Sequence, residues 1–485
     1  MNKLSRDLFF STGFSVLNVL FNFWLIQQAE YLLSAVALGV FMLMRRVVPT
    51  FTNLSQLGTS QAIIRYASIY KNEKQKIKTY FFLSFSGWIV STIVLGLIYL
   101  ALGQQLGDLT YDGTANSKQY FLYTVWYISI IHLSYLVQPY FLTLRKVLAY
   151  NFINLLNASL ILIVVFKYLS SSVTLELLLS YSLTAMSVLQ LVLLLYIVLR
   201  LEIYRFPSVE MIKTYGKEFY AYGIPRSIIT FSDMFLLTIG SLLVGSEQKQ
   251  IASFLIALAL TRIVLIILQP VSKLSSVIVG NNNSPERQKA AVNLMSGTIL
   301  YATTLLVIIL YNWLDVLLEY WLSKPETIKD VLYAFKIMAI GLVPYSIFHG
   351  LKGIIEIKFF KPYNLYTLIA AIVSHVALFY ILEQFYDTLY ALSFSLMIAF
   401  VILGIATAFW CRKDFLGNRY YRFDMLLIVG GGLFALNYYV NGTFQNIYAC
   451  LICVLVSTTI YLFILYITKA GFVFDTLETL LKKKN

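Results

Sequence analysis

The sequence predicts an all-α polytopic membrane protein with about 14 transmembrane helices. Of its 485 residues, 59% are hydrophobic and 12% are charged, whereas an ordinary soluble domain has roughly 45–50% apolar and about 25% charged residues. The mean hydropathy is +0.76, and apolar stretches of about 20 residues, the length that a helix needs to cross a membrane, recur along the chain. This composition excludes a soluble enzyme and a nucleic-acid-binding protein.

The predicted spans follow one another with short connections. They cover residues 9–28, 33–57, 80–102, 119–143, 148–169, 174–199, 219–244, 251–278, 291–314, 331–354, 363–383, 388–411, 425–440 and 447–468. No small-residue cleavage site follows the first stretch, so we expect a membrane span there and not a cleaved signal peptide.

Basic residues are distributed unequally between the two sides of the membrane. If the N-terminus is cytoplasmic, most of the 37 Lys and Arg residues fall in cytoplasmic segments. The outer segments hold Lys118, Lys167, Lys249, Lys324 and Lys329. This bias predicts a multi-pass protein of the cytoplasmic (inner) membrane with both termini in the cytoplasm. The net charge of +14 is therefore mainly a signal of topology.

Ionisable side chains inside the predicted spans are mostly cationic. Away from the first and last few residues of each span, the cations are Arg45, Arg46, Arg226, Arg262, Lys273 and Lys336, and the acid is Asp233. A charged residue at the centre of a membrane helix costs roughly 2.5–3.5 kcal/mol, so such residues persist where they face a wet cavity, a partner charge or a ligand. The imbalance predicts an electropositive interior.

Three of these arginines lie near the middle of a span, Arg45 and Arg46 on the second and Arg262 on the eighth. We expect them to line an anion-binding cavity, because the forked donors of a guanidinium suit phosphate. The alternative is that they bond to backbone carbonyls where Pro49 and Pro270 kink the same two spans.

Arg226 and Asp233 share the seventh predicted span. They stand two helical turns apart, near 10 Å by the pitch of about 5.4 Å, so we expect no direct pair between them. Arg226 fits a cavity cation and a structural residue equally well, and Asp233 is the candidate for coupling to an ion. Lys273 and Lys336 lie near span ends, where they can snorkel to the interface.

Motifs for catalysis and metal binding are missing from the sequence. There is no GxxxxGK[ST], so no nucleotide-hydrolysing site is predicted. The histidines His132, His349 and His375 lie on different spans, and the CxxC formed by Cys450 and Cys453 has no second pair. We expect no metal site, no cofactor and no enzymatic activity.

Two stretches of the sequence are similar to each other. AVALGVFMLMRRVVP at 35–49 and ASFLIALALTRIVLIILQP at 252–270 align so that Arg45 matches Arg262. Spans one to six and seven to twelve are therefore predicted to be parallel repeats, a transporter arrangement with the substrate at the repeat interface near mid-depth. The predicted regions are an N-lobe at 1–199, a cytoplasmic linker at 200–218, a C-lobe at 219–411, and two further spans with a basic cytoplasmic tail at 412–485.

Two segments carry a resemblance to a known family. GTSQAIIRYASIYKNEKQK at 58–76 and YGIPRSIITFSDMFL at 222–236, together with the span layout, resemble the polysaccharide transporters. These are lipid-linked oligosaccharide (O-antigen-type) flippases of the multidrug/oligosaccharidyl-lipid/polysaccharide (MOP) exporter superfamily. The resemblance implies two six-helix lobes around a central cavity that opens alternately to each side. It also implies a cationic cavity for the pyrophosphate and sugars of an undecaprenyl-linked substrate, with Arg45 or Arg46 and Arg262 among its arginines.

The function expected from this resemblance is the transfer of an undecaprenyl-pyrophosphate-linked oligosaccharide from the inner to the outer leaflet. Its expected partners are this substrate and membrane lipids, with a polysaccharide polymerase and glycosyltransferases acting beside it, and no nucleic acid.

Two alternatives stay open. A cation-coupled multidrug exporter of the same superfamily should carry carboxylates in its first lobe. We expect no acid in the interior of the first six predicted spans, since Glu176 lies at the very start of the sixth. A membrane glycosyltransferase or polymerase usually needs large outer loops. The longest outer loop here is 103–118, and we expect its acids, Asp108 and Asp112, to be solvated.

Overall fold

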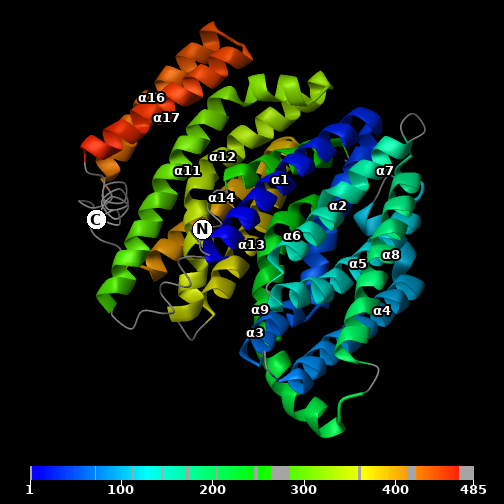
Figure 1. The fold of residues 1–485 in the computed structure, drawn as a ribbon. Helices are drawn as coiled ribbons and strands as arrows, with labels where there is room; N and C mark the ends of the chain where they lie inside the picture. The colour runs from blue at the N-terminus through cyan, green and yellow to red at the C-terminus, as the bar shows by residue number, and fades with distance from the viewer. Residues whose placement is uncertain are drawn as a thin grey trace. The chain divides into compact units, whose positions relative to one another are not determined.

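A computed structural model describes the helical parts of the chain (Figure 1). The described residues are 3–70, 73–111, 114–144, 146–169, 174–203, 206–244, 249–264, 285–358, 362–412 and 422–468. Within these ranges the regular structure is helical and no strand occurs. This confirms the predicted all-α fold class.

Twelve of the described helices are long and apolar enough to cross a membrane. They coincide with twelve of the predicted spans. Of the other two, 9–28 lies inside α1 (Lys3–Leu32), and 251–278 is described only up to residue 264. The total of fourteen spans therefore stays a prediction, and Lys273 lies outside the described residues.

The chain divides into two compact units, Met1–Ala252 and Ser253–Asn485. The helical segments of the first unit, after α1, are α2 (Ala35–Ser55), α3 (Thr59–Ile69), α4 (Lys74–Thr110), α5 (Ser117–Thr143), α6 (Val147–Leu155), the π-helical η1 (Leu156–Leu160), α7 (Ile161–Leu169), α8 (Leu175–Leu201) and α9 (Val209–Leu243).

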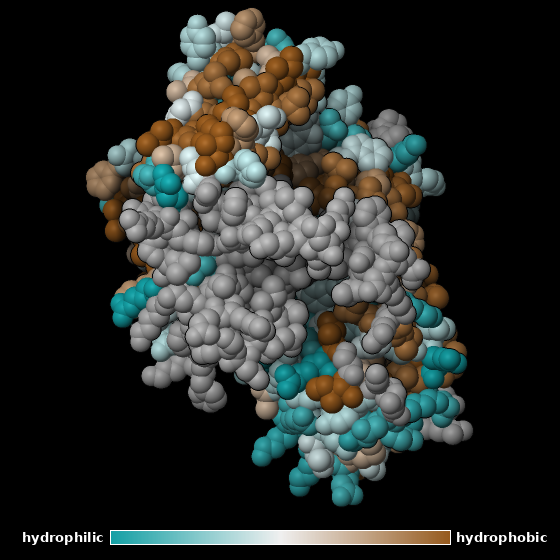
Figure 2. Space-filling model, turned by 60° about the vertical axis from the view of Figure 1, so that its left-hand side comes forward, coloured by the Kyte–Doolittle hydropathy of each residue, from teal (hydrophilic) through white to brown (hydrophobic). Residues whose placement is uncertain are grey.

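The core of the first unit is built around α2 and α5. Helix α5 contacts α2, α3, α4, α6 and α8, and α2 also contacts α9. Most of the apolar window of α2 and of α5 is buried, whereas α4 leaves most of its window exposed. Figure 2 shows apolar side chains gathered on parts of the visible surface, mainly in the upper region of the view. The unit thus turns apolar side chains outward, as a lipid solvent requires.

Helix α9 packs in the first unit, although the sequence analysis places its residues at the start of the C-lobe. It contacts α2, α3 and α4, and its residues lie before the division at Ala252. The predicted lobe boundaries stay a prediction, and the contacts show that α9 is attached firmly to the preceding helices.

The second unit contains six labelled helices. They are α11 (Pro285–Trp321), α12 (Pro325–Lys358), α13 (Tyr363–Leu382), α14 (Thr388–Trp410), α16 (Phe423–Thr443) and α17 (Ile447–Ile467). Helix α12 packs on α11 and α14, and α14 packs on α13. Figure 1 shows α16 and α17 as a hairpin, and both helices contact α11.

Polar side chains attach this hairpin to α11. Trp313 Nε1 donates a hydrogen bond to Asn437 Oδ1 at 2.8 Å, and Asn437 Nδ2 donates to Ser457 Oγ at 2.8 Å. Cys450 and Cys453 are buried in the same cluster as Trp313, which agrees with a packing role for the CxxC. Polar contacts of this kind join helices where lipid leaves no hydrophobic driving force between them.

A glycine lets α12 and α14 approach closely. A Cβ atom added to Gly404 of α14 would overlap Pro344 of α12, whereas nothing lies near a Cβ added to Gly432 of α16. We expect Gly404→Val to lower the free energy of unfolding by about 1–3 kcal/mol, the usual cost of overpacking. Gly432→Val is the matched control. The thermal unfolding of both variants in detergent checks this expectation, and equal melting temperatures would contradict it.

Candidate functional site

The candidate site is the polar interior of the first unit where α1, α2, η1 and α9 approach one another. Arg45 and Arg46 lie near the middle of α2, as the sequence analysis predicts. Arg46 is 6% exposed, and Arg45 is half-buried. Neutral oxygens on α1, η1 and α9 accept hydrogen bonds from the two arginines.

Arg45 joins three elements. Its Nη2 donates to Asn22 Oδ1 of α1, and also to the backbone carbonyl of Ala158 in η1 at 3.2 Å. The guanidinium carbon lies 5.6 Å from the ring centroid of Phe41. A π-helical turn bonds i to i+5 and often marks a functional site. The irregular turn thus presents a backbone carbonyl to a cationic side chain.

Arg46 joins α2 to α9. Its Nε donates to the carbonyl of Leu237 at 3.4 Å. One turn further along α2, the hydroxyl oxygens of Thr50 and Thr238 lie 2.8 Å apart, which adds a second hydrogen bond between the same helices. A third comes from Ser227 of α9, whose hydroxyl donates to the carbonyl of Asn53.

Polar side chains follow the arginines on α2, around Pro49. Proline lacks an N–H, so the helix loses the hydrogen bond to the carbonyl of Arg45, one turn earlier. Thr50 Oγ1 donates to the carbonyl of Arg46 at 2.9 Å, and Asn53 Nδ2 donates to the carbonyl of Pro49 at 2.8 Å. These two hydroxyl and amide groups thus find acceptors on their own helix, as polar side chains in membrane helices commonly do.

Both readings of the arginines find support in this geometry. Arg45 and Arg46 do bond to backbone carbonyls, as the alternative interpretation expects. These carbonyls, however, belong to Ala158 in η1 and Leu237 in α9. The arginines therefore connect α2 to other elements and do not only satisfy carbonyls of α2 itself. Their lining of an anion-binding cavity stays a prediction.

Asp233 and Arg226 both lie on α9 of the first unit, and Arg262 belongs to the second unit. Asp233 is buried in α9, 6% exposed, one turn before Leu237. Arg226 is exposed, and its Nη1 donates to the carbonyl of Tyr222 at 3.2 Å. Arg262 is exposed on the helical residues 253–264 of the second unit. The roles predicted for these residues stay predictions.

Glu30 corrects one expectation. The sequence analysis ends the first span at residue 28 and expects no acid in the interior of the first six spans. Helix α1 continues to Leu32, and Glu30 is 0% exposed, so the expectation is wrong. The next helix begins after Ser34, whose hydroxyl accepts a hydrogen bond from Ala37 N at 3.2 Å and caps the N-terminus of α2.

A buried amide network next to η1 was also missed. Ser134 Oγ accepts hydrogen bonds from Gln138 Nε2 and Asn157 Nδ2, both at 2.8 Å. Gln190 Nε2 donates to Asn157 Oδ1 at 3.1 Å. Asn157 precedes Ala158, so η1 connects this network to Arg45. Only the presence of several amides and hydroxyls in otherwise apolar stretches could have pointed to it.

The histidines occupy separate packed positions. The Nδ1 atoms of His132 and His375 each lie 2.9 Å from a serine hydroxyl, that of Ser91 and that of Ser395 respectively. His349 packs edge-on against the ring of Tyr345. Among the described residues, no group of three His, Cys, Asp or Glu side chains could hold a metal ion.

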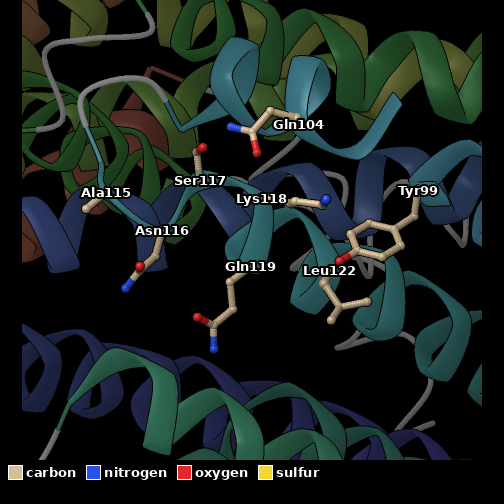
Figure 3. A pocket seen from close by; sticks show the side chains of 8 residues that line it. All are labelled: Tyr99, Gln104, Ala115, Asn116, Ser117, Lys118, Gln119 and Leu122. Carbon is tan, nitrogen blue, oxygen red and sulfur yellow. The ribbon is translucent and has the colours of Figure 1, made fainter. Parts of the chain in front are cut away.

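A pocket of about 410 Å³ lies where α4 ends and α5 begins (Figure 3). Its lining residues are Tyr99, Gln104, Ala115, Asn116, Ser117, Lys118, Gln119 and Leu122. Asp108 accepts hydrogen bonds from Gln104 Nε2 at 2.9 Å and from Ser117. Asp112 lies outside the described residues. The pocket includes none of the arginines of the candidate site.

Comparison with solved structures identifies proteins with the same fold. No family model and no curated protein matches the sequence. Among solved structures, the chain is similar to one titled "Lipid II flippase MurJ, inward closed conformation", with a TM-score of 0.74 and 14% identity over 98% of this chain and 99% of that chain. The chain shares this fold.

Two structures of multidrug resistance MATE family transporters of the MOP superfamily are also similar. The inward-facing one has a TM-score of 0.61 and 17% identity over 82% of this chain and 94% of that chain. The outward-facing one has a TM-score of 0.56 and 15% identity over 85% and 94%. Identities this low establish a common fold and leave the substrate open.

Asn157 offers a test of the amide network. Asn157→Leu removes both of its hydrogen bonds and leaves buried polar partners behind, at a cost of about 1–3 kcal/mol. We expect a clearly lower melting temperature in detergent. Asn151→Leu is the matched control, because the Nδ2 of this buried asparagine makes no hydrogen bond within the described residues. An equal loss of stability in both variants would contradict this expectation, because it would show that the hydrogen bonds of Asn157 add no stability beyond that of a buried asparagine without them.

Proposed function

We propose that the protein is a flippase that moves an undecaprenyl-pyrophosphate-linked oligosaccharide from the inner to the outer leaflet of the cytoplasmic membrane by alternating access. The observation that carries the proposal is the adjacent pair Arg45 and Arg46 in the interior of the first unit, at the middle of α2. The fold shared with a lipid II flippase supports it.

Arginine suits this substrate. A polar group that enters an apolar environment without a partner costs several kcal/mol, and a charge costs far more. The planar guanidinium binds phosphate through two parallel hydrogen bonds. Asn22, Ala158 and Leu237 hold the two arginines through neutral oxygens.

The extent of the structural similarity favours the flippase over the exporters. The likeness to the lipid II flippase covers 98% of this chain, and the likeness to the inward-facing exporter covers 82%. In the proposed arrangement, residues 1–199 and 219–411 form the two lobes, both termini are cytoplasmic, and Arg262 joins Arg45 and Arg46 in a common cavity. A polysaccharide polymerase and glycosyltransferases would act beside the flippase.

The membrane potential can drive this transport. It is negative inside, and moving one negative charge outward releases about 2.3 kcal/mol per 100 mV. The same potential favours the inward return of an emptied cationic cavity. The proposal therefore needs no nucleotide hydrolysis. Asp233 is the first residue to examine for an additional coupled ion.

A second candidate function is a cation-coupled exporter, and Glu30 favours it. A buried carboxylate in the first lobe is the feature that the sequence analysis requires of such a protein, and Glu30 is 0% exposed. A buried ionisable side chain in a membrane helix marks a functional site by default.

Charge removal tests the flippase proposal. We expect Arg45→Gln, Arg46→Gln and Arg262→Gln each to slow transfer of the lipid-linked oligosaccharide in proteoliposomes at least about tenfold, because a hydrogen bond to a charged group contributes about 1.5–3 kcal/mol. The control Lys329→Gln removes an exposed cation of α12 and should keep the wild-type rate. Full activity of all three arginine variants would contradict the cationic cavity.

Glu30 separates the two candidate functions. If the protein is a flippase, Glu30→Gln should leave lipid transfer unchanged and wild-type protein should export no cationic drug. If it is an exporter, wild-type protein should expel a cationic dye against a proton or sodium gradient and Glu30→Gln should abolish that export. Glu210→Gln, at an exposed acid of α9, controls for the loss of one carboxylate.

A further inference from the structure

Two exposed arginines share one aromatic ring where α3 approaches α9. The guanidinium carbon of Arg65 lies 4.5 Å from the ring centroid of Tyr222, and that of Arg226 lies 3.8 Å from it. Arg226 also donates a hydrogen bond to the carbonyl of Tyr222 at 3.2 Å. A single ring therefore holds two cations from different helices, on the side of the membrane predicted to be cytoplasmic.

The fold brings these residues together through a backbone contact. Gly58, which precedes α3, has a φ of 72°, and a Cβ atom there would overlap the carbonyl of Gly223. Only glycine adopts this left-handed conformation at little cost and leaves room for the contact. Helix α3 then turns Ile63 and Tyr66 into the core. Arg65 stays exposed beside α9.

The two guanidinium carbons lie 4.5 Å and 3.8 Å from the ring centroid of Tyr222, so this aromatic side chain brings two positive charges near each other. Within the described residues, neither Arg65 nor Arg226 forms an ion pair. Glu218 is an exposed acid one turn before Tyr222, and its backbone carbonyl accepts a hydrogen bond from Tyr66 at 3.3 Å. Like charges near each other repel, and an anion bound beside both arginines would offset this repulsion.

The chemistry of the pair suits a phosphate group on a lipid. A guanidinium stacked on a ring keeps the N–H donors at its edge available for the paired oxygens of phosphate. Ile69 follows Arg65 by one turn on α3 and is 56% exposed, so an apolar side chain stands beside the charge. Helix α3 connects the membrane-spanning α2 and α4 and is thus expected at the membrane surface.

We propose that Arg65, Arg226 and Tyr222 form a binding site for the pyrophosphate head group of a membrane lipid, which docks there before it moves to Arg45 and Arg46. This inference rests on the proposed function for the identity of the lipid. The site differs from the candidate site described above, because its residues are exposed and lie on α3 and the first half of α9.

The test measures lipid binding to the full chain in phosphatidylcholine nanodiscs. The probe is undecaprenyl pyrophosphate, and all variants carry Arg45→Gln and Arg46→Gln so that the interior arginines do not contribute. We expect the further pair Arg65→Gln and Arg226→Gln to weaken binding at least about tenfold, since each lost charged contact contributes about 1.4 kcal/mol or more. Melting temperatures equal to that of the parent with Arg45→Gln and Arg46→Gln establish that the further variants fold.

Matched variants make the result specific. Lys213→Gln with Lys217→Gln removes the same charge from exposed positions of α9 and should leave binding nearly unchanged. Tyr222→Phe keeps the ring and should bind like its parent, whereas Tyr222→Leu should weaken binding. Equal losses in the arginine and lysine pairs would overturn the proposal, because they would indicate unspecific attraction.

Competing probes decide the ligand. Phosphatidylglycerol that displaces undecaprenyl pyrophosphate at similar concentration would overturn the assignment to a pyrophosphate lipid. Inorganic pyrophosphate that binds as tightly as the lipid would overturn the lipid requirement. The proposed function has a separate readout, the transfer of lipid by the otherwise unchanged chain. Normal transfer with no effect of Arg65 or Arg226 on binding would therefore reject this site alone, and absent transfer with intact binding would reject the flippase.

Discussion

The hydrogen bond between the guanidinium of Arg45 and the carbonyl of Ala158 is the contact on which the interior of the first unit depends. A cation in the middle of a membrane helix is stable only where polar groups replace its water, and a π-helical turn is tolerated at this depth only where it is buried in protein. Each irregular feature therefore stabilises the other. Asn157 extends the connection to Ser134 and Gln190, so one turn of η1 links α1, α2, α5 and α8.

Helix α9, the first span of the predicted second repeat, packs against α2 and the connection from α2 to α3. The residues of α9 that make these contacts extend from Gly223 through Ser227 to Leu237 and Thr238. These contacts explain why α9 packs with the first unit. They also place an exposed arginine pair at one end of the α2–α9 contact and the buried arginine pair of α2 further along it, a sequence of cationic positions that a phosphate-bearing lipid could follow.

The parts of the structure that lipid dictates could be predicted from the sequence. The spans can be located because the hydrocarbon core sets the length of an apolar stretch. The bounds of the second span place Arg45 and Arg46 near its middle, and the cost of burying a charge there marks them as site candidates. Glu30 was missed because α1 continues beyond its apolar stretch. The π-helical turn at Leu156–Leu160 has no signature in composition, and the attachment of α9 depends on contacts between residues far apart in sequence, which periodicity does not report.

The central claim is that the buried arginines of α2 bind the phosphates of a lipid-linked substrate. The most direct measurement is an experimental structure of the wild-type chain with undecaprenyl-pyrophosphate-linked oligosaccharide bound. The account predicts that phosphate oxygens lie within hydrogen-bond distance of the guanidinium of Arg45 or Arg46. A bound substrate whose phosphates contact neither arginine, with Arg45 still bonded to Asn22 and Ala158 as in the free protein, would contradict it.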